Sequence, residues 1–160
     1  MEKVVYHRKL IQSPIGPLTL LGTEAALTRI LFGDGWRDTE GSVPVLDQTA
    51  RELEEYFAGA RREFTVPLAP EGTAFQRKVW AALREIPYGA TVTYGEIAAR
   101  IGKPKAAVAV GQANGRNPIP IIIPCHRVVG ANGKLVGYTG GLHIKEALLA
   151  VESAGPQGEF

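Results

Sequence analysis

Residues 91–115 read TVTYGEIAARIGKPKAAVAVGQANG, and they contain the signals for two short helices with a tight turn between them. Thr93 followed by Glu96 has the capping-box spacing that begins a helix, and Gly102 ends that helix. Pro104 suits the first turn of a second helix, which closes at an Asn-Gly pair. Two short helices joined by a turn of this kind predict a helix-turn-helix.

The second of these helices carries mostly small side chains. Helices that read sequence in the major groove usually project Arg, Asn or Gln toward the base edges. A smooth helix can instead lie close to a narrow groove or a DNA backbone, or it can pack tightly against another helix. Lys103, Lys105 and Arg116 at its ends favour contact with phosphates. The small residues are Ala106, Ala107, Ala109, Gly111 and Ala113.

The rest of the sequence has a helical pattern just before this stretch and mostly strand patterns in the first half of the chain. Ahead of it, Thr73 and Gln76 repeat the capping-box spacing and begin a helix with an apolar stripe. The first half instead alternates apolar, β-branched runs with Gly and Pro turns, which is typical of strands. Strands are predicted over residues 4–11, 18–21, 26–32 and 63–68, and a helix over 44–59.

These elements predict an α+β protein. The helix in the first half should bury Leu46, Ala50, Leu53 and Phe57, which recur at helical spacing. The best boundary is the Pro- and Gly-containing stretch PLAPEGT. We therefore expect a small N-terminal α/β scaffold domain, a mostly helical C-terminal domain with the helix-turn-helix, and a short tail, over residues 1–69, 70–153 and 154–160.

Charge is unevenly distributed along the 160 residues, although the net charge is only +2. Residues 1–69 hold eight Lys/Arg and ten Asp/Glu, a net charge of −2, whereas residues 70–153 hold ten and five, a net charge of +5. The positive half favours an anionic partner. No apolar run reaches the length of a membrane span and the N-terminus has no signal-peptide pattern, so a cytoplasmic protein is expected.

The only cysteine, Cys125, lies in the apolar stretch IIIPCHRVVG beside His126. A lone cysteine can be an inert buried residue, whereas a reactive one needs a base or a positive neighbourhood to form thiolate. If the chain turns after Pro124 instead of continuing as a strand, His126 could reach the sulfur directly or through one water. Glu152, near the end of a predicted helix, is the candidate partner that would orient His126.

The residues around Cys125 resemble a known family. IPCHRVVG, preceded by NGRNPIPII and followed by GYTGGLHIKEALLAVE, is similar to the O6-alkylguanine-DNA alkyltransferases, also called methylated-DNA–protein-cysteine methyltransferases. The similarity runs in order through residues 73–152. It implies a ribonuclease-H-like N-terminal domain and a winged-helix-like C-terminal domain. No cofactor is implied, and no metal site is expected because residues 1–69 contain no cysteine and only His7.

The resemblance also implies a reaction. The protein would bind double-stranded DNA as a monomer, rotate an O6-alkylguanine out of the stack and transfer the alkyl group irreversibly to Cys125, once per molecule. O4-alkylthymine is a second candidate lesion. His126 would act as the base through water, Glu152 would orient it, and Tyr94 would donate a proton to the departing guanine.

Further roles follow from the resemblance. Val128 and Cys125 would offer main-chain carbonyls to the exocyclic amine of the guanine, and Asn117 would be a hinge between the helix-turn-helix and the cysteine segment. Arg127 is assigned to a structural ion pair. The substrate pocket would be completed by Tyr138, Thr139 and Gly140. The DNA-contacting residues would be Thr93, Tyr94, Lys103, Lys105, Ala106, Val108, Ala109, Gly111 and Arg116.

One position departs from the family pattern. Where an arginine commonly fills the gap left by the flipped base, this chain has Val108. Valine can act as a steric wedge but cannot hydrogen-bond the orphaned base, so extrusion or retention of the lesion is expected to be weaker. Three other functions stay open: a lesion-binding protein without activity, a helix-turn-helix regulator with an inert thiol, and a thiol hydrolase.

Overall fold

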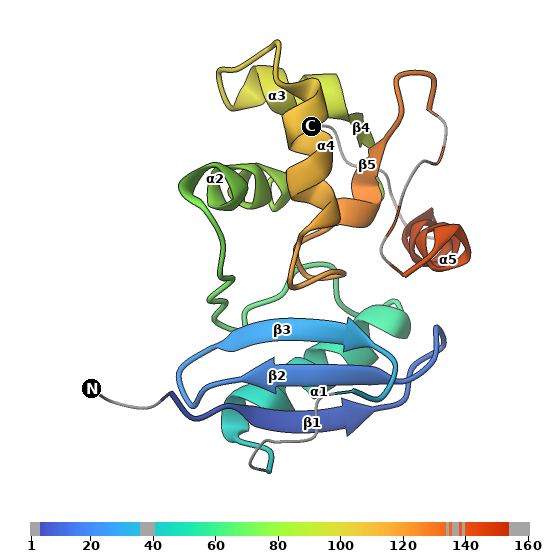
Figure 1. The fold of residues 1–160 in the computed structure, drawn as a ribbon. Helices are drawn as coiled ribbons and strands as arrows, with labels where there is room; N and C mark the ends of the chain where they lie inside the picture. Colours follow the sequence, from blue (N-terminus) through green and yellow to red (C-terminus); the bar gives the residue numbers. More distant parts are fainter. Residues whose placement is uncertain (1–3, 36–40, 134, 136–137, 139, 154–160) are drawn as a thin grey trace. The chain divides into compact units, whose positions relative to one another are not determined.

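The computed structural model describes residues 4–35, 41–133, 135, 138 and 140–153. The chain divides into two compact units, residues 1–71 and 72–160. In the first unit, β1 (His7–Ile11), β2 (Leu18–Gly22) and β3 (Leu27–Phe32) form an antiparallel sheet in the order β1-β2-β3. Helix α1 (Pro44–Phe57) packs against all three strands (Figure 1). Every residue of the central strand β2 is buried.

Two sequence predictions for this unit are wrong in part. Residues 63–68 form no strand beyond a single bridge from Leu68 to Leu27. The buried carboxylate of Glu52 accepts the backbone N–H groups of Thr65 and Val66, at 2.8 and 3.3 Å, and so takes the place of a neighbouring strand.

The buried face of α1 is also rotated from the predicted one. Leu46 and Leu53 are buried as expected, but Thr49 and Tyr56 complete the face, and Ala50 and Phe57 are only half-buried. The Thr49 hydroxyl donates to the Val45 carbonyl at 2.8 Å. That bond removes the cost of burying a polar group on the core side of the helix.

The second unit is mostly helical. Its elements are α2 (Ala74–Leu83), β4 (Val92–Thr93), α3 (Tyr94–Arg100), α4 (Ala107–Gly115), η1 (Cys125–Arg127), β5 (Val128–Val129) and α5 (Leu142–Ser153). Helix α4 packs on both α2 and α3, and β4 pairs in parallel with β5 (Figure 1). Trp80 on α2 is buried and donates from its indole nitrogen to the Ala113 carbonyl at 2.8 Å.

Both predicted capping boxes are confirmed. The Thr73 and Thr93 hydroxyls accept from the backbone of Gln76 and Glu96, whose side chains accept in return from the cap residues. Helix α4 begins at Ala107, later than the predicted start at Pro104, because residues 103–106 close a turn through the Ala106 N–H and the Lys103 carbonyl. The α3–turn–α4 pair is the predicted helix-turn-helix, and the α+β fold class is confirmed.

Candidate active site

The path that leads to Cys125 is held by one asparagine. Asn117 accepts from the Ile119 N–H at 2.9 Å and donates to the Ile123 carbonyl at 2.7 Å, so its side chain bridges the turn after α4. Within this turn Ile121 has a φ of 76°, a left-handed conformation that is costly for a β-branched residue. The turn stops the apolar run from forming a strand, and the chain enters the short helix η1 at Cys125.

Cys125 is buried, with 5% of its surface exposed. Burial raises the pKa of its thiol, while the Asn117 and Tyr138 side chains and the Lys145 ammonium act in the opposite direction without overcoming it. The sulfur therefore rests as a thiol, and a base must take its proton before it can act as a nucleophile. The neighbouring Asn114 side chain donates to the Cys125 carbonyl at 3.4 Å.

His126 and Glu152 form a buried pair. The imidazole Nε2 lies 2.6 Å from Oε2 of Glu152, and both residues are at most 1% exposed. Because an ionised carboxylate only accepts, Nε2 must carry the proton and Nδ1 is left as an acceptor. Nδ1 is buried without a hydrogen-bond partner among the described residues. Burial lowers the pKa of His126 and outweighs the attraction of Glu152, so the ring is neutral and able to accept a proton.

The ion pair predicted for Arg127 is present. Its Nε donates to Glu152 Oε1 at 2.8 Å and its Nη2 to Oε2 at 3.0 Å. Burial alone would raise the pKa of Glu152, but the hydrogen bond from His126 and the pairing with Arg127 hold that pKa well below its usual range. Gly89 adds a backbone N–H donor to Oε1 at 3.2 Å. The carboxylate thus stays ionised and fixed in place.

Lys145 was missed by the sequence analysis. It is fully buried, and its ammonium donates to the Val128 carbonyl at 2.6 Å, the carbonyl assigned to guanine binding. Burial lowers the pKa of Lys145, and the Cys125 sulfur acts in the opposite direction. A signal was available, because Lys145 lies three and seven residues before Leu148 and Glu152 and so shares their face of α5.

Tyr94 begins α3 and is half-buried. Its ring lies against α4, since a Cβ added at Gly111 would meet ring carbons at 3.7 and 3.8 Å. Burial raises the pKa of Tyr94, and the Cys125 sulfur adds to the effect, so the phenol keeps its proton and remains a donor. Tyr94 therefore lies close to both helix α4 and the Cys125 sulfur.

The predicted DNA-contacting residues lie along the helix-turn-helix. Lys103, Lys105, Val108, Ala109 and Arg116 are exposed, whereas Thr93, Tyr94, Ala106 and Gly111 are half-buried. Val108 has 78% of its surface exposed, which is unusual for a large apolar side chain on a well-packed helix. Tyr138 and Gly140 are half-buried near α5, and Thr139 lies outside the described residues.

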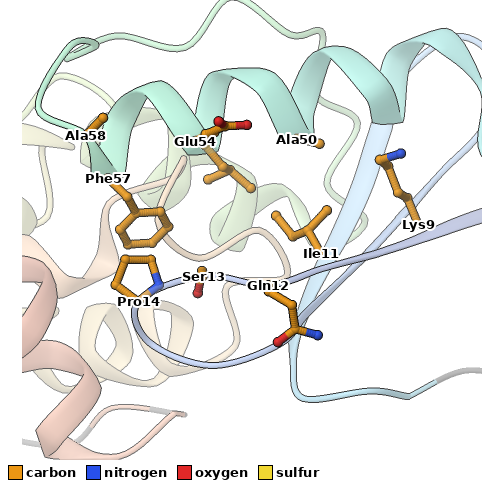
Figure 2. A pocket seen from close by; sticks show the side chains of 10 residues that line it. Lys9, Ile11, Gln12, Ser13, Pro14, Ala50, Glu54, Phe57 and Ala58 are labelled. Carbon is orange, nitrogen blue, oxygen red and sulfur yellow. The ribbon is translucent and has the colours of Figure 1, made fainter.

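The first unit contains a hollow of its own. Its volume is about 630 Å³, and it lies between the end of β1, the turn at Ser13 and Pro14, and the last turns of α1 (Figure 2). Phe57 and Pro14 lie close together there, with Lys9 and Glu54 as the charged side chains. Its lining contains no cysteine or histidine, so it offers no counterpart to the cluster around Cys125.

The described part of the chain shows neither a metal cluster nor a membrane-spanning helix. No group of three or more His, Cys, Asp or Glu side chains could hold a metal ion there. None of the helices in the same residues has the length and apolarity needed to cross a membrane.

A helix-turn-helix beside a buried cysteine and an imidazole–carboxylate pair defines a DNA-binding protein with a candidate cysteine nucleophile. Residues 74–154 match the DNA-binding domain of 6-O-methylguanine DNA methyltransferase, and residues 6–70 match its ribonuclease-like domain. The chain belongs to the methylated-DNA–protein-cysteine methyltransferase family.

Individual relatives cover nearly the whole chain. A methylated-DNA–protein-cysteine methyltransferase of Methanosarcina acetivorans is 54% identical over 154 residues, covering 91% of this chain and 97% of that protein. The Mycobacterium tuberculosis protein of the same name is 49% identical, covering 92% and 93%. The crystal structure of the M. tuberculosis protein OGT in complex with DNA matches with a TM-score of 0.87 and 50% identity, covering 92% of this chain and 93% of that one.

Proposed function

We propose that this protein repairs DNA directly, by transferring the alkyl group of O6-alkylguanine in double-stranded DNA to its own Cys125. Family membership supports the reaction, and one observation carries its assignment to this site: the residue after Cys125 is a neutral, buried histidine hydrogen-bonded to an ionised glutamate. A buried thiol needs such a base to become a nucleophile.

Alkyl transfer is coupled to the movement of two protons. His126 Nδ1 takes the thiol proton through one water, and the sulfur attacks the alkyl carbon as the carbon–oxygen bond to guanine breaks. Tyr94 donates a proton to the departing guanine and is reprotonated from solvent, while His126 releases the thiol proton to solvent. The products are guanine in the DNA and a thioether at Cys125, which is too stable to be reversed, so each molecule reacts once.

The lesion must leave the base stack, because the sulfur cannot reach a base inside the duplex. We assign the DNA contacts to the exposed side of the α3–α4 pair, where Lys103, Lys105 and Arg116 supply positive charge. The flipped guanine would donate its exocyclic amine to the carbonyls of Cys125 and Val128. Tyr138, Thr139, Gly140 and Asn117 would complete the pocket, and O4-alkylthymine is a second candidate substrate.

Intact mass spectrometry with free O6-benzylguanine or an alkylated duplex tests this function. We expect a gain of one benzyl or alkyl group per chain, lost in Cys125→Ser. Binding without a mass change would instead indicate a lesion-binding protein or a regulator, and repeated turnover would indicate a hydrolase. The presence of Cys125 favours transfer over binding alone.

Two finer expectations belong to the same proposal. A monomer is expected, and light scattering of the free protein and of its DNA complex tests that state. A cytoplasmic location is also proposed, and fractionation of producing cells with an antibody against the protein tests it.

A further inference from the structure

Arg127 has more contacts than an ion pair alone would need. Beyond its two bonds to Glu152, its Nη1 donates to the Ile86 carbonyl at 2.7 Å, and its guanidinium carbon lies 5.8 Å from the centre of the Tyr88 ring. Only 6% of its surface is exposed. Since the loop after α2 holds the guanidinium independently of Glu152, its charge has a fixed position.

We propose that Arg127 is a positioning residue that neutralises Glu152 so that His126 remains an uncharged base. This proposal rests on the proposed function. Glu152 accepts hydrogen bonds from Arg127, His126 and Gly89. The guanidinium alone balances the negative charge of the carboxylate, so the imidazole need not be charged. Without the guanidinium, a carboxylate buried 2.6 Å from an imidazole would be neutralised by protonating that ring.

The other charged groups near the ring do not replace Arg127. Lys145 bonds to the Val128 carbonyl and interacts with Cys125, so it acts on the sulfur side of the cluster. It also lowers the pKa of His126, after the stronger effect of Arg127. The titratable and charged groups facing the cluster in the described residues are Cys125 and Arg127 on η1, Lys145 and Glu152 on α5, Tyr88 in the loop, Tyr94 on α3, and Tyr138.

Arg127 affects how alkyl transfer depends on pH. In the wild type the pKa of His126 lies below its ordinary value, so the base form is present through neutral pH. In Arg127→Met that pKa rises, so the base form is lost as the pH falls through the raised value. Alkyl transfer should then fall at least about tenfold at mildly acidic pH and recover toward the wild-type rate at alkaline pH.

Single-turnover transfer from free O6-benzylguanine, measured from about pH 5 to about pH 9, tests this prediction without DNA contacts. Arg127→Lys keeps the positive charge, so the fall of its transfer rate at low pH (the acid limb of the pH–rate profile) should occur at the same pH as in the wild type. The double variant Arg127→Met/Glu152→Gln removes both charges and should move the acid limb back toward lower pH. Arg84→Met, an exposed position on the same unit, is the matched control and should change neither rate nor profile.

An acid limb that stays in place in folded Arg127→Met, or a faster reaction at low pH, would overturn the proposal. If that variant does not fold, 15N NMR of the wild-type His126 ring decides the matter: a neutral Nε2–H ring at neutral pH supports the proposal, and a cationic ring overturns it. Because the NMR readout needs no alkyl transfer, failure of the proposed function would be seen separately.

Discussion

At the scale of single residues, the chemistry depends on how buried charges are paired. Arg127 and Lys145 are both buried cations, yet they contact different partners: one bonds to the Glu152 carboxylate and the other to a main-chain carbonyl. Lys145 acts on the Cys125 thiol by lowering its pKa, so its charge favours the thiolate.

We expect Lys145→Met to slow alkyl transfer by at least about tenfold at neutral pH, because the thiolate loses a nearby positive charge and its pKa rises further. Methionine is similar in volume, so the variant should fold. The measurement is the rate of benzyl transfer together with a thermal melt. An unchanged rate in a folded variant would show that Lys145 has only a structural role.

At the scale of elements, helix α4 presents a smooth surface with one projecting apolar side chain. Its small residues allow Trp80 on α2 to bond to the Ala113 carbonyl and Tyr94 to approach Gly111. Val110, Ala113 and Asn114 form the buried side of α4, whereas Val108 is exposed. Close packing and close approach to DNA are therefore compatible on different sides of this helix.

Val108→Arg should strengthen binding to an alkylated duplex and speed repair, since it adds a charge and a hydrogen-bond donor where valine offers only a wedge. The slope of log affinity against log salt should become steeper by about one. Because Val108 is exposed, stability should change by less than about 0.5 kcal/mol.

The measurements are DNA affinity as a function of salt concentration and the rate of repair. Val108→Lys is the control, because it adds a positive charge without the planar set of guanidinium donors. If neither DNA affinity nor repair rate changes in Val108→Arg, the assignment of this position to the DNA interface is wrong.

At the scale of the whole molecule, the proposed alkylation of Cys125 would add a group to the core of one unit. Cys125 is 5% exposed and lies against side chains from several elements, so an added alkyl group must displace neighbours. Overpacking of this kind costs about 1–3 kcal/mol. We therefore expect alkylation to lower the melting temperature, by about 2–4 °C per kcal/mol, and more for benzyl than for methyl.

Thermal melts before and after reaction check that expectation, with unreacted Cys125→Ser treated in the same way as the control. Equal melting temperatures for the free and benzylated protein would mean that the site already has room for the group.

Local signals determined where α2 and α3 begin and pointed to Cys125 as the candidate nucleophile. Capping boxes at Thr73 and Thr93 act within one turn, so they could be recognised without the fold. The Pro-Cys-His-Arg string carried the family resemblance, and with it the roles of His126, Glu152 and Tyr94, which stay predictions. A short sequence pattern can be recognised when the interactions behind it are also made between residues close in the chain.

Only the tertiary structure decided which charges meet. Glu52 replaces a strand partner for Thr65 and Val66, and residues 63–68 consequently form no strand. Lys145 joins the cysteine cluster, and the loop after α2 fixes Arg127 beside Glu152. These contacts join residues 13 to 41 positions apart in the chain, and the energy of a buried charge depends on neighbours that sequence spacing does not specify.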